Sequence, residues 1–278
     1  MEAESRYHPG ADVLALVASL EDIGMVGMGV SGARCGSGFG AAEEALIVVG
    51  LGRRLAAPAL LATIGALHAR IDLNERRVAA AYRRGERIVI VEDPLADLVL
   101  VRDRDFAALY ELKDPSASVD HHLWLAHLRS TTNLGEPLAR FDSAQQLRLR
   151  LIDAAALAGI AEATLDMSVA RVGSFETVRQ HCTNMAIAAR CARDQVSFAA
   201  VAIDEEREDA ALQVDSALFV AGSAALENAA KNVQIHGGAP VGAQPDPQLY
   251  LERAQLLVAI AGGLDATDRR VANTKVSD

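Results

Sequence analysis

The sequence predicts a mainly helical protein with a small β-domain in its middle. Aromatic residues make up only 4% of a chain that is 51% hydrophobic and rich in Ala, which favours closely packed helices over a β-sandwich. Apolar residues recur at helical spacing towards both ends, whereas short β-branched runs are confined to the middle. We therefore expect an N-terminal helical domain at residues 1–79, a reduced β-domain at 80–141, a C-terminal four-helix bundle at 142–264 and a flexible tail at 265–278.

The first 70 residues are expected to form helices separated by Gly-rich turns. An apolar stripe runs from Leu14 to Ile23 and ends at Gly24, which suits a helix C-cap. A Gly-rich break over residues 32–40 precedes two further predicted helices, at 41–55 and 58–69. Because no strand precedes the break and no Gly-Lys-Ser/Thr follows it, the residues predict a loop rather than a phosphate cradle.

The middle segment changes to short apolar runs. The runs 87–91, 98–101 and 106–110 are bounded by charges and by Pro94 and Pro115. β-Branched runs of this length between turn residues are typical of strands. We expect three or four strands here.

The helical pattern returns after Asp142 and continues to about residue 262. Ser143 suits the N-cap of the first helix, and helical periods then cover residues 147–165, 177–203, 212–233 and 249–260. Four helices with short connections form an antiparallel bundle. Apolar residues left on the outside of such a bundle become subunit contacts, and the polar C-terminal tail is expected to fray.

Charge and cysteine usage exclude several classes of function. A net charge of −10 and a pI near 5.2 argue against a nucleic-acid partner or an anionic membrane surface. No run of ~18 apolar residues could span a bilayer, and the N-terminal residues lack an apolar signal region, so we expect a soluble cytoplasmic protein. The three cysteines have no metal-ligand spacing and predict neither a metal site nor a disulfide: Cys35, Cys182 and Cys191.

The run Gln234-Ile235-His236-Gly237-Gly238 resembles the signature of acyl-CoA dehydrogenases. In that family the run joins two long helices. Two N-terminal stretches, 20–30 and 43–58, are similar to the family's N-terminal helical domain in order and spacing. The resemblance covers both ends of the chain and weakens in the middle, where the family's flavin-ring motifs are absent. It implies an acyl-CoA dehydrogenase-like fold with a shrunken β-domain.

The resemblance also implies a cofactor, FAD, bound mainly by a neighbouring subunit. In the family, the positions of Gln234, Gly237 and Gly238 contact the adenosine diphosphate part of that FAD, and Gly permits the close backbone approach. The plain alternative is that the glycines only end a helix. The family's Arg-x-Gln-Phe-Gly turn is missing, so that only Arg171 or Arg179 could replace its Arg; otherwise both are solvated charges at helix ends.

The resemblance places the family's catalytic Glu six residues after the second Gly, where this chain has Gln244. A neutral amide cannot act as a general base near pH 7. A second family position falls near Leu149 and Arg150, which also lack a carboxylate. Asp246 could be a displaced base, although catalytic geometry tolerates an error of only ~1 Å. We therefore expect no catalytic residue in this chain.

These features support one main hypothesis and two alternatives. The main one is a base-lacking subunit that pairs with a full-length acyl-CoA dehydrogenase in a hetero-oligomer, like the actinobacterial enzymes that desaturate steroid-CoA thioesters. The partner would supply the flavin-ring site and the base. The first alternative is a non-enzymatic homo-oligomer that serves assembly or binds CoA esters and has lost flavin. The second is an altered reaction that uses Asp246 or His181 as an acid or base.

Overall fold

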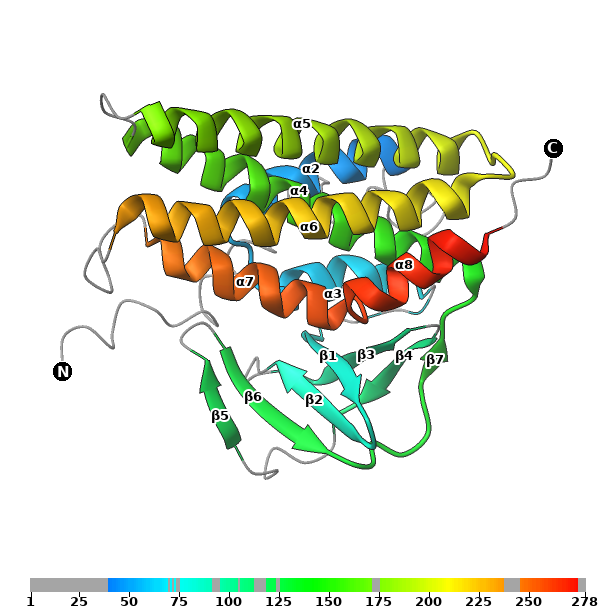
Figure 1. The fold of residues 1–278 in the computed structure, drawn as a ribbon. Coiled ribbons are helices and arrows are strands. Elements are labelled where there is room, and N and C mark those ends of the chain that lie inside the picture. The colour runs from blue at the N-terminus through cyan, green and yellow to red at the C-terminus, as the bar shows by residue number, and fades with distance from the viewer. Residues whose placement is uncertain are drawn as a thin grey trace. The chain divides into compact units, whose positions relative to one another are not determined.

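The computed structural model describes residues 40–69, 71, 73, 76–91, 96–104, 106–112, 119–123, 126–171, 176–237 and 246–274. The described chain forms two compact units, one within residues 57–146 and the other made of residues 40–56 and 147–274 (Figure 1). This division differs from the predicted boundary at residue 79, because the first described helix groups with the bundle. Several predicted features lie outside the described residues: the stripe ending at Gly24, the Gly-rich loop, Cys35, Gly238 and Gln244.

The first unit contains a seven-stranded sheet with the order β5-β6-β2-β1-β3-β4-β7. Its strands are β1 (Val78–Arg84), β2 (Arg87–Val91), β3 (Leu98–Asp103), β4 (Phe106–Glu111), β5 (Val119–Leu123), β6 (Ala126–Thr131) and β7 (Ala139–Arg140). Among the described strand pairs, β1–β3 is parallel and the other five are antiparallel. The helix α3 (Pro58–Leu67) packs against β1.

The prediction of three or four strands was too low. The predicted runs form β2, β3 and β4. Strand β1 was not predicted, because its Ala residues have a low intrinsic preference for strands. It forms because both of its faces are buried, as they are in β3. Gly85, with φ +61°, makes the tight turn that joins β1 to β2. Alternate side chains of four strands build one core cluster: Ala79, Ala81, Ile88, Ile90, Val99, Val101, Ala108 and Tyr110.

The regular elements described in the second unit are all helices. The unit contains α2 (Ala41–Arg53), α4 (Ser143–Arg171), α5 (Glu176–Asp204), α6 (Ala210–His236), α7 (Pro247–Ile260) and α8 (Leu264–Asn273), with the first residues of α4 belonging to the sheet unit. The four predicted bundle helices are α4 to α7. In this unit α5 packs against α2 and α6, and α6 also packs against α7 and α8 (Figure 1). None of the described helices is long and apolar enough to cross a membrane.

The expectation of a flexible tail at residues 265–278 was wrong for its described part, which forms α8. The segment is polar overall, but one side of the helix is buried, as Ala266 and Thr267 show. Arg270 Nε lies 3.0 Å from Oδ1 of the buried Asp215, which also receives Arg150. Average polarity therefore concealed a docked amphipathic helix.

The predicted N-cap at Ser143 was also wrong by one residue. Asp142 Oδ1 accepts from the Gln145 backbone N–H at 2.8 Å, and Gln145 Oε1 accepts from the Asp142 N–H at 2.7 Å. This reciprocal pair is a capping box with Asp142 at the N-cap.

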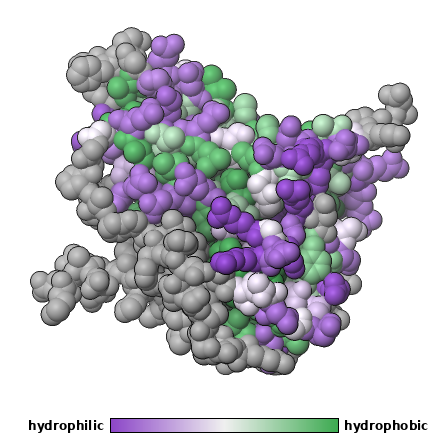
Figure 2. Space-filling model, turned by 60° about the horizontal axis from the view of Figure 1, so that its bottom comes forward, coloured by the Kyte–Doolittle hydropathy of each residue, from purple (hydrophilic) through white to green (hydrophobic). Residues whose placement is uncertain are grey.

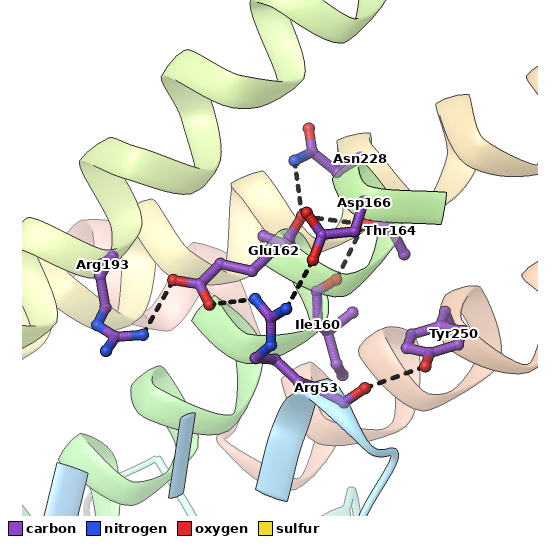
Figure 3. Close-up of polar contacts among 9 residues, drawn as sticks. Arg53, Ile160, Glu162, Thr164, Asp166, Arg193, Asn228 and Tyr250 are labelled. Carbon is purple, nitrogen blue, oxygen red and sulfur yellow. Dashed lines mark hydrogen bonds and ion pairs between the residues drawn. The ribbon is translucent and has the colours of Figure 1, made fainter. Parts of the chain in front are cut away.

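Ion pairs fix α2 to the bundle (Figure 3). Arg53 lies 2.7 Å from Glu162 and 2.6 Å from Asp166, both on α4, and Glu162 also receives Arg193 of α5 at 3.0 Å.

On the face drawn in Figure 2, hydrophobic residues reach the surface in several places among hydrophilic ones. Seven large hydrophobic side chains are exposed among the described residues: Leu46, Leu138, Val169, Ile187, Phe198, Val201 and Phe219.

Candidate functional site

Four helix ends meet at one end of the bundle unit. The antiparallel succession of α4 to α7 places there the C-termini of α4 and α6 and the N-termini of α5 and α7 (Figure 1). This end therefore collects five residues that the sequence singled out: Arg171, Arg179, Gln234, Gly237 and Asp246.

The last turn of α6 presents an exposed amide beside a left-handed glycine. Gln234 is exposed, and its Oε1 accepts from Lys231 Nζ at 3.2 Å. Gly237 has φ +53° and ψ +65°, and its N–H donates to the carbonyls of Val233 and Gln234 at 3.1 and 3.2 Å. Gly237 thus ends the helix in the conformation that favours Gly. Among the described residues, an added Cβ on Gly237 would meet only Gln234 O, at 3.9 Å.

Gly237→Ala is expected to destabilise the helical unit by about 1 kcal/mol, because a Cβ is disfavoured in the left-handed conformation. Gly237→Asn should cost less, because Asn tolerates this conformation. Urea denaturation of both variants measures the difference. Equal stability of the Ala variant and the wild type would show that the left-handed cap does not persist in solution.

Buried polar side chains hold the end of α6 in place. Ser168 Oγ on α4 donates to Asn232 Oδ1 at 2.9 Å, and both residues are fully buried. One turn earlier, Asn228 Nδ2 donates to Ala161 O of α4 at 3.1 Å and to Met185 O of α5 at 3.0 Å. These bonds fix α6 against two neighbours just before its exposed end. The sequence reasoning missed them, although two Asn residues four apart in an Ala-rich helix were a usable signal.

His236 has its tautomer set by the backbone. Its Nδ1 lies 2.9 Å from Asn232 O. Because a carbonyl oxygen can only accept, Nδ1 carries the proton in this hydrogen bond and Nε2 is the remaining acceptor of a neutral ring. Nδ1 of His236 is therefore engaged within the last turn of α6, and Nε2 is the second nitrogen of the half-buried ring.

Asp246 serves as the N-cap of α7. Its carboxylate accepts from the Gln248 N–H at 2.9 Å, and Pro247 occupies the first helical position. A carboxylate is favoured at this place both as a cap and by the helix dipole. The contact gives Asp246 a structural role, which weakens the hypothesis of a displaced base.

The donor set at this bundle end suits the adenosine diphosphate part of a dinucleotide. The amide of Gln234 can both donate and accept, and Lys231 adds a cation beside it. The exposed Arg171 and Arg179 add guanidinium groups that can bind phosphate. These cations are needed, because the C-terminus of α6 carries the negative end of its helix dipole. No group of three or more potential metal ligands occurs among the described residues.

Two cysteines lie on α5 and both are free thiols. Cys182 is buried, and burial raises its pKa. Cys191 is exposed on the outer face of the helix. Neither one belongs to the cluster of helix ends.

Comparison with known proteins adds independent findings. Residues 148–276 match the family described as acyl-CoA dehydrogenase, C-terminal domain. The chain is 24% identical over 276 residues to acyl-CoA dehydrogenase IpdE2 of Mycolicibacterium smegmatis, covering 91% of this chain and 84% of the relative.

Two solved structures share the fold. A variant of the steroid ACAD Tcur3481-Tcur3483 aligns with a TM-score of 0.74 and 18% identity, covering 94% of this chain and 88% of that one. The ChsE4-ChsE5 complex from Mycobacterium tuberculosis aligns with a TM-score of 0.68 and 20% identity, covering 97% of this chain and 99% of that one.

Proposed function

Because the chain belongs to the acyl-CoA dehydrogenase family, whose C-terminal domain it matches over residues 148–276, we propose that it is the reduced subunit of a FAD-dependent heteromeric enzyme that α,β-desaturates a CoA thioester. One observation carries this proposal. The end of α6 keeps an exposed Gln234 beside a left-handed Gly237, with Arg171 and Arg179 at the same bundle end. A protein that used the bundle only for assembly would not need this set of donors.

The chain contributes binding and orientation to the proposed site. Bound FAD would supply the acceptor for the β-hydrogen of the thioester, which leaves as hydride, and a carboxylate base would remove the α-proton. Gln234 and the backbone of Gly237 would hold the adenosine end of FAD, and Arg171 and Arg179 would bind its pyrophosphate. The buried Ser168–Asn232 bond keeps α6 in register for these contacts.

The base and the flavin-ring site come from the partner in this proposal. Gln244 has a neutral side chain, and Asp246 is engaged in capping α7. The partner is a full-length acyl-CoA dehydrogenase chain, and the assembly is a cytoplasmic heterotetramer. Similarity to the steroid ACAD Tcur3481-Tcur3483 and to the ChsE4-ChsE5 complex favours a bulky, steroid-derived CoA ester as the substrate.

The visible absorption spectrum tests the proposal. The chain purified alone is expected to be colourless, and the complex with a full-length relative from the same genome is expected to be yellow, with about one FAD per pair of unlike chains. Flavin bound to the chain alone would contradict the dependent subunit and return Asp246 as a candidate base. A colourless chain that finds no partner would favour the non-enzymatic homo-oligomer.

A further inference from the structure

The side chain of Lys231 sets the orientation of the Gln234 amide. Lys231 Nζ donates to Gln234 Oε1 at 3.2 Å. The two residues are three positions apart on α6, which places them on the same face of the helix. Lys231 is half-buried and Gln234 is exposed, so the contact reaches from the preceding turn to the exposed end of the helix.

This contact gives the Gln234 amide one polarity. The last torsion angle of a glutamine side chain is broad and nearly two-fold, so that its oxygen and nitrogen can exchange places. An ammonium group carries only donors, and so does an amide nitrogen, which means that Lys231 can bond only to the amide oxygen. With Oε1 turned towards Lys231, Nε2 and its two hydrogens point away from the lysine.

The polarity of the amide is important because the end of α6 is rich in acceptors. The last carbonyls of a helix have no partner within it, and they carry the negative end of the helix dipole. Two nearby donors are used inside the helix: the Gly237 N–H bonds to the carbonyls of Val233 and Gln234, and His236 Nδ1 bonds to Asn232 O. An acceptor atom of a ligand at this end therefore depends on side-chain donors such as Gln234 Nε2.

We propose that Lys231 is a positioning residue for the cofactor. By holding Oε1, it makes Gln234 present Nε2 as a hydrogen-bond donor to an acceptor atom in the adenosine diphosphate part of FAD. A ring nitrogen or an oxygen matches this donor, whereas the exocyclic amino group of adenine, itself a donor, does not. The inference rests on the proposed function, to which it adds the amide atom that meets the cofactor and the residue that selects this atom.

The bond between Lys231 and Gln234 affects binding more than folding. Polar pairs on an exposed helix face contribute little to stability, so a substitution of Lys231 should leave α6 folded. When a bound cofactor covers the pair, water no longer competes for the amide and the ammonium group, and the same hydrogen bond becomes stronger. We therefore expect Lys231 variants to change the FAD affinity while they keep the urea midpoint of the wild type.

Gln234→Glu tests the polarity of the contact with the ligand. The carboxylate keeps the length of the side chain and can accept from Lys231, but it has no donor for the ligand. The flavin-free complex with the partner subunit should bind FAD about tenfold more weakly than the wild type or worse, as expected for a lost hydrogen bond. Fluorescence titration with FAD measures this affinity. If the Glu variant bound FAD as tightly as the wild type, the ligand atom would be a donor and the proposal would be wrong.

A double-mutant cycle tests whether Lys231 acts through Gln234. Lys231→Met should weaken FAD binding about fivefold when Gln234 is present, and have no effect in the Gln234→Leu background, because no amide is left to orient. Lys231→Arg should bind FAD nearly as the wild type does, since a guanidinium also carries only donors. Equal weakening by Lys231→Met in both backgrounds would show that the lysine acts on the ligand as a charge, which contradicts the positioning role.

Arg269→Met is the matched control for the loss of one positive charge. Arg269 is exposed on α8, outside the cluster of helix ends, and its substitution should leave the FAD affinity unchanged. The same titrations separate this inference from the proposed function. A wild-type complex that binds no FAD would overturn both. A wild-type complex that binds FAD, combined with additive effects of Lys231→Met and Gln234→Leu, would overturn the positioning role alone.

Discussion

Gly159→Ala is expected to destabilise the helical unit by about 3 kcal/mol, the upper part of the usual range for overpacking. An added Cβ at Gly159 of α4 would lie 2.1 Å from Val49 O and 2.8 Å from Arg53 N of α2. Both atoms are backbone, so no side-chain rotation can relieve the clash. The two helices would have to separate, which would also stretch the ion pairs of Arg53 with α4.

Gly50→Ala is the matched control on the opposite helix of this crossing. Gly50 lies on α2, and apart from its own stretch of helix no described residue comes within 4 Å of the position of an added Cβ. Ala there should stabilise the helix by up to about 1 kcal/mol through its higher helix propensity. Urea denaturation compares the two variants with the wild type. A Gly159→Ala variant as stable as the wild type would show that α2 and α4 do not approach each other this closely.

Arg253→Met should lower the stability of the helical unit by about 3 kcal/mol, because it removes the charge-assisted hydrogen bonds of a buried guanidinium. Arg253 of α7 is 4% exposed, and its Nη1 donates to Leu55 O at 2.8 Å and also to Ala56 O. Leu55 has φ +55°, an uncommon conformation for a non-Gly residue. Removing the guanidinium leaves two carbonyls without this donor at the end of α2, where helix carbonyls need partners.

Tyr250→Phe provides the comparison for Arg253→Met. The Tyr250 hydroxyl donates to Arg53 O at 3.0 Å from an exposed position, so its loss should cost about 1 kcal/mol or less (Figure 3). The order of the two midpoints in urea is the measurement. If Tyr250→Phe proved as damaging as Arg253→Met, the main support of this turn would be Tyr250 instead.

The helical bundle could be predicted from the sequence because each of its helices repeats apolar residues at a helical period. The strand runs of β2, β3 and β4 were visible for a similar reason. Two elements that the sequence did not predict are β1 and α8, in which the local sequence pattern disagrees with the structure that forms. The Ala residues of β1 favour a helix, and α8 is polar except on the side that docks.

Only the part of the candidate site that lies in one short run of residues could be predicted from the sequence. The Gln-Ile-His-Gly-Gly string identified Gln234 and the left-handed Gly237. Its support was invisible, because Ser168 and Asn232 are 64 positions apart in the chain. The same limit hid Asp204, which accepts from the first backbone N–H groups of α2 from more than 160 positions away.

The affinity of the co-purified complex for FAD tests most directly whether the end of α6 completes a flavin site. Gln234→Leu removes an exposed amide and should leave the fold and the subunit ratio intact, while it weakens FAD binding about tenfold, as loss of a polar contact in a binding site does. Glu227→Gln, at another exposed position on α6, is the control and should bind FAD as the wild type does. Fluorescence titration of the flavin-free complexes with FAD gives the dissociation constants. An unchanged FAD affinity in the Gln234→Leu complex would contradict the proposal that this chain holds the cofactor through Gln234.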